Sequence, residues 1–149
     1  MKNWLVLLLA LPLFAMATDQ DEIDVCLSNW KDHPFKGHSN DFRTISAKVK
    51  IMGIGGELKD DAKSEQPELI LVKPTVNVMS KQVVKLLNPN GWYCLKSSVA
   101  VLGKTQIELG CGAKFTASNT GATVLGSGDE DSGVTVLGKS EITREKCSQ

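Results

Sequence analysis

The sequence has no excess of charge of either sign, because 17 lysine and arginine residues balance 17 aspartate and glutamate residues. A nucleic-acid-binding domain needs a basic surface that displaces counterions from phosphates, so no nucleic acid is expected as a partner. After the N-terminal residues, no apolar run reaches the roughly 20 residues that a transmembrane helix requires. We therefore expect one globular domain without a membrane-spanning segment.

The sequence also lacks the compact motifs of common active sites. It has no G-x-S-x-G nucleophile turn, no H-E-x-x-H zinc motif and no glycine-rich phosphate loop with a lysine. Aromatic residues make up only 5% of the chain, and Trp92, directly after a turn, is better explained by packing than by sugar binding. These absences favour a protein that is not an enzyme and that needs no cofactor.

Residues Met1–Ala17 have the pattern of a signal peptide. Lys2 supplies the positive charge, Trp4–Phe14 supplies the apolar core, and the chain then reads Ala15-Met-Ala17 before the expected cleavage. The apolar run is too short for a membrane anchor, which is the alternative interpretation. The pattern predicts export to the periplasm or the extracellular space and a mature domain of residues 18–149.

The mature part contains four cysteines, Cys26, Cys94, Cys111 and Cys147. An even number in an exported chain indicates two disulfides, and four cysteines allow three pairings. We favour Cys26–Cys147, which would join the ends of the domain, and Cys94–Cys111, which would close a short loop. Because the chain has no C-x-x-C pair, a zinc site is not expected.

A short phrase, x-V-x-V-[L/M]-[G/S], recurs along the chain. Its copies start at residues 48, 75, 98, 121 and 133, in steps of 27, 23, 23 and 12 residues. Equal steps with apolar residues two apart are typical of a unit that stacks on itself. We predict an all-β fold, a short β-helix-like solenoid over residues 44–149, with an antiparallel β-sandwich as the alternative. The last step is too short for a full coil and could be a half-turn or a closing hairpin.

The repeat is similar to that of small exported bacterial β-helix proteins, over roughly the last two thirds of the chain. The resemblance implies a β-helix fold and export, but it includes no motif that points to a function.

The segments outside the repeat have their own expected roles. Residues 18–43 are expected to be a cap over the open end of the stack, with a helix over Asp24–Trp30 that Asp24 caps. Glu57–Pro67 is very polar and is expected to be a surface loop or one short helical turn. Glu68–Val72 is expected to be a strand buried on both sides.

Lysine follows the closing residue of three copies, at Lys81, Lys104 and Lys139, and a β-branched residue (Val84, Ile107, Ile142) comes three residues later. Stacked in this register, the lysines would form a row on one face. Such a row could bind an anionic envelope polymer, for instance acidic polysaccharide or lipid head groups. The alternative is that the lysines only discourage pairing between exposed strands.

Two further groups could bind metal. His33 and His38 lie near Asp32 and Asp41, and Asp129–Asp131 offers oxygen ligands for calcium, but neither set matches a complete metal motif, so solvated loops are the simpler interpretation. We therefore expect an exported binding or structural module of the cell envelope, whose ligand is an envelope polymer or protein. The alternative is a small secreted enzyme or enzyme inhibitor that presents Trp30–Phe42 or Ser127–Ser132 to its target.

Overall fold

The structure is a computed structural model that describes residues 18–46, 50–53, 57–73, 76–96, 99–118, 123–124, 127–128, 134–136 and 139–148. The predicted signal peptide, the calcium candidate Asp129–Asp131 and residues 129–132 of the predicted loop Ser127–Ser132 lie outside the described residues. The elements are α1 (Asp19–Asn29), β1 (Arg43–Ser46), β2 (Lys50–Gly53), β3 (Glu57–Asp60), β4 (Glu68–Lys73), β5 (Val76–Leu86), β6 (Gly91–Leu95), β7 (Val99–Val101), β8 (Lys104–Leu109), β9 (Lys114–Ala117), β10 (Thr123–Val124), β11 (Ser127–Gly128), β12 (Val134–Val136) and β13 (Lys139–Arg144).

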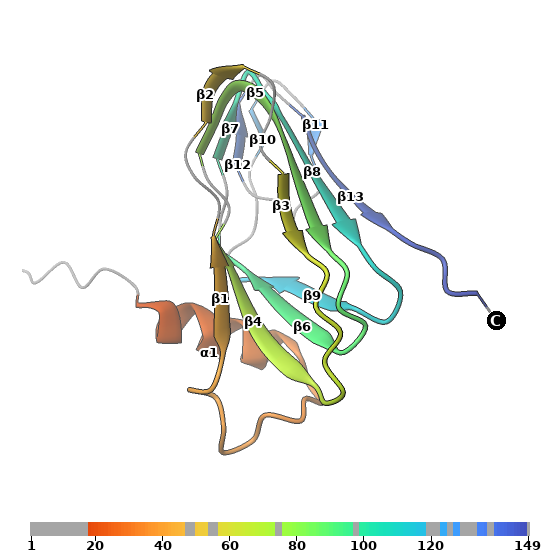
Figure 1. Cartoon of the computed structure of the whole chain (residues 1–149). Coiled ribbons are helices and arrows are strands. Elements are labelled where there is room, and N and C mark those ends of the chain that lie inside the picture. Colours follow the sequence, from red (N-terminus) through yellow and green to blue (C-terminus); the bar gives the residue numbers. More distant parts are fainter. Residues whose placement is uncertain are drawn as a thin grey trace, which may run out of the picture.

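The described strands form two sheets. Sheet A has the order β1-β4-β6-β9, and a nine-stranded sheet contains the other strands. The long strand β5 belongs to two parts of the larger sheet (Figure 1). We name these parts arm B (β2, β5, β7, β12, β10) and arm C (β3, β5, β8, β13, β11). Every pairing among the described strands is parallel, so the predicted β-rich class is confirmed and the antiparallel sandwich is wrong.

The first two sequence steps reappear as the offsets between paired strands. Lys50 pairs with Asn77, which is an offset of 27 residues, and Val76 pairs with Val99, which is an offset of 23. A parallel pair needs a long connection between its strands, and here sheet A supplies part of each connection. The phrase spacing therefore predicted the register of these strand pairs correctly.

The last copies do not stack in chain order. Val99 of β7 pairs with Val134 of β12, and Thr123 of β10 pairs with Thr135 of the same strand β12. The fifth copy of the phrase thus lies between the third and the fourth. The 12-residue step corresponds to a parallel pairing, which contradicts the closing hairpin that the sequence left open.

Alternate residues of β4 point to two different cores, as expected for a strand buried on both sides. Ile70 and Val72 pack between sheet A and arm C with Val84 and Ile107, whereas Leu69 and Leu71 face the other way. Full burial of each such side chain contributes about 1.5–3 kcal/mol. The second core lies under α1, which covers the outer face of sheet A (Figure 1). The segment expected to be a cap therefore packs on this sheet face through α1.

Two local predictions were wrong in their bounds. The helix spans Asp19–Asn29 and starts earlier than expected, because Thr18 is its N-cap: the hydroxyl of Thr18 accepts from the Asp21 backbone N–H, and the Asp21 carboxylate accepts from the Thr18 N–H. This reciprocal capping box stabilises the first turn more completely than Asp24 could. The expected loop Glu57–Pro67 begins with strand β3, which pairs with β5 in arm C.

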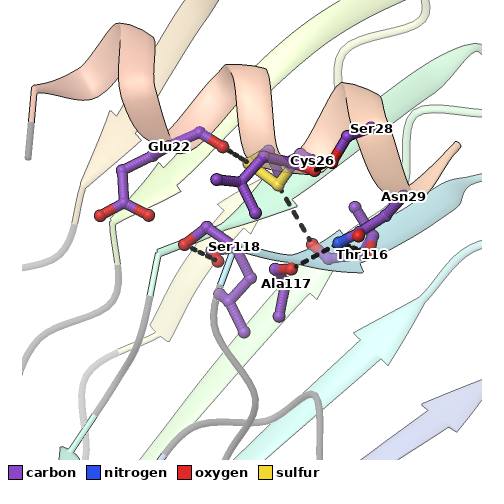
Figure 2. The surroundings of a disulfide bond; sticks show 10 residues. Glu22, Cys26, Ser28, Asn29, Thr116, Ala117 and Ser118 are labelled. Atoms are coloured by element: carbon purple, nitrogen blue, oxygen red, sulfur yellow. Dashed lines mark hydrogen bonds between the residues drawn. A yellow bond between two sulfur atoms is a disulfide. The ribbon is translucent and has the colours of Figure 1, made fainter.

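The favoured disulfide pairing was also wrong, because the bonds are Cys26–Cys94 and Cys111–Cys147. Cys26 lies on the face of α1 that packs on sheet A, where Cys94 of β6 points outward into the same core. Figure 2 shows the neighbouring contact, in which the Asn29 amide of α1 donates to the Ala117 carbonyl of β9 at 3.1 Å. Cys111 lies in the turn between β8 and β9, and the chain after β13 reaches it because the Glu145 N–H donates to the Leu109 carbonyl.

Candidate functional site

The three lysines of the predicted row lie side by side on arm C. Lys81 of β5 pairs with Lys104 of β8, and Lys104 pairs with Lys139 of β13. We call these residues the lysine row. Lys104 and Lys139 each have a paired residue on both sides within arm C, so these two lysines do not guard a sheet edge. The register of the row is as predicted, whereas ligand binding by these lysines stays a prediction.

Glu141 neutralises part of the lysine row. One of its oxygens lies 3.4 Å from Lys104 Nζ and the other lies 2.9 Å from Lys139 Nζ. The hydrogen bond from Lys139, more than the one from Lys104, holds the pKa of Glu141 below its ordinary value. Among the side chains that the structure describes, three lysines thus lie against one carboxylate, an excess of two positive charges. Like charges directly opposite each other on neighbouring strands destabilise a sheet, so the row is not explained by stability.

Two apolar side chains stand beside the lysine row, at the fifth position of the repeated phrase. Met79 and Leu102 have φ angles of 53° and 55°, and 54% and 51% of their surfaces are exposed. The left-handed backbone costs about 1–2 kcal/mol for a residue other than glycine. Leucine and methionine at a strained, exposed position therefore do not serve the core. We call Met79, Leu102 and the lysine row the corner ridge.

The corner ridge follows the junction between the two arms. Residues Val76–Val78 of β5 pair with β7 in arm B, and Lys81–Leu86 pair with β8 in arm C, so Met79 lies at the change from one to the other. Leu102 has the same place between β7 and β8. Figure 1 shows β5 bending at this junction, at the top of the view. The sequence contains a signal for Leu102, since in Val99-Ala-Val-Leu102 the leucine directly follows a valine and so breaks the alternation of apolar residues, but the exposure of its side chain required the structure.

A second candidate site is an open pocket of about 490 Å³ beside the first residues of β1 and β4. Phe42 and His38 line it together with Arg43 and Glu68. The Arg43 guanidinium already forms two ion pairs within the protein: Nε donates to Glu68 at 2.6 Å, and a second nitrogen lies 3.0 Å from an Asp60 oxygen. The hydrogen bond to Glu68 is the main cause that raises the pKa of Arg43. The pocket thus has no strong cationic centre for an anion.

The two histidines have separate surroundings. The Nδ1 atom of His33 accepts from the Phe35 backbone N–H at 3.2 Å, and the His33 ring stacks on the Phe35 ring with centroids 6.2 Å apart. His38 lines the pocket. Within the ranges that the structure describes, no group of three histidine, cysteine, aspartate or glutamate side chains is placed to hold a metal ion.

Behind the pocket, a buried polar network fixes the end of the sheets. The Tyr93 hydroxyl donates to Asp60 at 2.7 Å and accepts from the Asn88 backbone N–H at 3.0 Å. Burial, and then the hydrogen bond to Asp60, raises the pKa of Tyr93. Tyr93 and Asn88 are fully buried, and Asp60 is 4% exposed. A substrate cannot reach these groups, so the network is structural.

Comparisons of the chain with protein-family models, curated proteins and solved structures found no match. Among the residues that the structure describes, no helix combines the length and the apolar character needed to cross a membrane.

Proposed function

We propose that the protein is an exported, non-enzymatic binding module of the cell envelope, and that its described strands belong to a short β-helix-like solenoid. One observation carries the binding role: the three lysines of the lysine row are direct neighbours on interior strands of arm C. Such a row attracts a surface or polymer of negative charge. The proposed ligand is an anionic component of the envelope.

Export is supported by the two disulfides, which are typical of oxidising compartments. The expected cleavage between Ala17 and Thr18 leaves the complete capping box of α1 in the mature chain, since Thr18 is the N-cap. Sequencing the N-terminus of the secreted protein, with a non-reducing peptide map, tests this part. A start at Thr18 with Cys26 joined to Cys94 supports export. A retained Met1 or free thiols would contradict it.

Binding is tested by retention on a polyanion matrix as a function of salt. Replacing Lys81, Lys104 and Lys139 together by glutamine should lower the salt concentration needed for elution, because charge attraction between exposed groups is screened by salt. The matched control replaces three exposed lysines outside the ridge, Lys31, Lys63 and Lys146, by glutamine, which changes the net charge equally. Equal effects of the two triple variants would contradict a role of the row.

The pocket favours a second candidate, a secreted inhibitor or enzyme that uses the segment Trp30–Phe42. Phe42 and His38 from this segment line the pocket, where a small ligand or a partner's side chain would fit. Replacing Phe42 and His38 by alanine should abolish inhibition or activity in a screen of the secreted protein and leave polyanion retention unchanged. If a detected activity survives these changes, this candidate fails.

A further inference from the structure

We propose that the corner ridge seats the protein on an anionic lipid surface, with Met79 and Leu102 in the interfacial region and the lysine row on the lipid phosphates. The inference rests on the proposed function, because it names the envelope component that the same lysines would bind. The observation that favours lipid, and that the proposed function does not use, is the exposure of Met79 and Leu102 in the corner ridge.

Met79 and Leu102 occupy equivalent places in successive coils, since they precede the paired residues Lys81 and Lys104 by two positions. Neighbouring parallel strands lie about 4.8 Å apart, so the two side chains form a short line along the junction. Single exposed apolar residues are ordinary on protein surfaces. Here two of them are more than half exposed, on left-handed backbone, at the same position of a repeated phrase. The phrase has methionine or leucine at this position in all five copies.

The lysine row lies beside this apolar line, because Lys81 follows Met79 and Lys104 follows Leu102 by two residues in the chain. A line of apolar side chains next to a line of cations matches the chemistry of a membrane interface, where acyl chains lie under anionic head groups. A soluble polysaccharide would use the lysines and offer nothing to Met79 and Leu102. The combined features therefore favour a lipid surface over a polymer.

The partial neutralisation by Glu141 is compatible with this role. Glu141 contacts Lys104 and Lys139, while Lys81 is exposed at the other end of the row beside Met79. Each lysine close to an anionic surface strengthens binding, and this attraction becomes negligible at distances beyond about one Debye length. Binding should thus require both negative lipid and direct contact.

The experiment is co-sedimentation of the secreted protein with vesicles of phosphatidylcholine, with or without phosphatidylglycerol. The variant Met79→Asn/Leu102→Asn tests the ridge, because asparagine tolerates the left-handed backbone and removes the apolar contact. We expect binding only to the anionic vesicles, and about tenfold or greater loss in the double variant, from the transfer of two half-exposed apolar side chains. The matched control is Val25→Asn, which removes the exposed apolar residue of α1, 43% exposed, and should leave binding unchanged.

The outcomes separate the two proposals. If wild type is retained on the polyanion matrix but does not bind anionic vesicles, or if the double asparagine variant binds them as wild type does, the lipid inference is overturned and the proposed function stands. If neither matrix nor vesicles bind the wild type, both fail. Circular dichroism checks that the double variant is folded, and Met79→Gly/Leu102→Gly replaces it if it is not, since glycine also accepts these φ angles.

Discussion

Removing the disulfide Cys26–Cys94 should destabilise the protein more than removing Cys111–Cys147. The two bonds close loops with sequence separations of 68 and 36 residues. In the chain-entropy model both loops are worth about 4 kcal/mol, and the difference in length contributes only about 0.5 kcal/mol. Loop length alone therefore predicts nearly equal losses for the variants Cys26→Ala/Cys94→Ala and Cys111→Ala/Cys147→Ala.

The expected losses of stability differ because the two disulfides have different surroundings. Cys26 and Cys94 are fully buried in the core between α1 and sheet A, so alanine at both positions leaves a cavity where the sulfur atoms were. A cavity of methyl size costs about 1 kcal/mol, and two bring the expected loss to about 6 kcal/mol. Cys147 is exposed in the chain after β13, so its removal leaves no such cavity and the loss should stay at or below about 4 kcal/mol.

Denaturant unfolding of the two double variants measures these losses. Fluorescence and near-ultraviolet circular dichroism also report on the site itself, because the Trp30 and Trp92 rings meet edge to face in this core, with centroids 5.2 Å apart. The Cys26→Ala/Cys94→Ala variant should lose this aromatic signal first, as α1 leaves sheet A. An equal or larger loss of stability in the Cys111→Ala/Cys147→Ala variant, with an unchanged aromatic signal in the other, would refute the reasoning.

Three further substitutions test the network and the helix start. Tyr93→Phe should cost about 2–3 kcal/mol in denaturant unfolding, because Asp60 and the Asn88 N–H lose a buried hydrogen bond; a loss within error would show that water replaces the hydroxyl. Gly91→Ala should cost about 1–3 kcal/mol, since a Cβ atom would lie 2.6 Å from the fixed Tyr93 ring, and an unchanged midpoint would contradict that contact. Hydrogen bonds from the N-cap residue lower the pKa of Asp21 below 3.8, so its contribution is present above pH 3.8 and is lost as pH falls through the lowered pKa. Asp21→Asn should therefore reduce stability at neutral pH and flatten the acid side of the pH profile, and an unchanged acid side would contradict the assignment.

The register of the paired strands could be predicted from the sequence because its cause is local. Apolar residues two apart and a small residue at the end of each phrase determine which side chains stack, and Val84, Ile107 and Ile142 indeed lie in one cross-strand row. The strand between Glu68 and Val72 was also identified correctly, because a continuous apolar run fits a strand with two buried faces.

The disulfides and the order of the last strands depend on contacts between distant segments, which spacing does not encode. The pairing of Cys26 follows from the position of α1 on the outer face of sheet A, and the sequence offered no sign of which face the helix would cover. The corner ridge was predicted only in part: the lysines were identified, but Met79 and Leu102 were assigned no role, because their left-handed backbone is set by the junction of the two arms.

The insertion of β12 and β13 between earlier strands constrains the order of assembly during synthesis. Strand β10 pairs only with β12 and β11 only with β13 among the described strands, and both partners are made after them. A chain still attached to the ribosome can complete the described pairings through β8, but β10 and β11 have no described partner strand until β12 and β13 have emerged. These two strands therefore pair only after β12 and β13 have been made, and a nascent chain halted before Val134 would expose β7 and β8 as open templates for another strand.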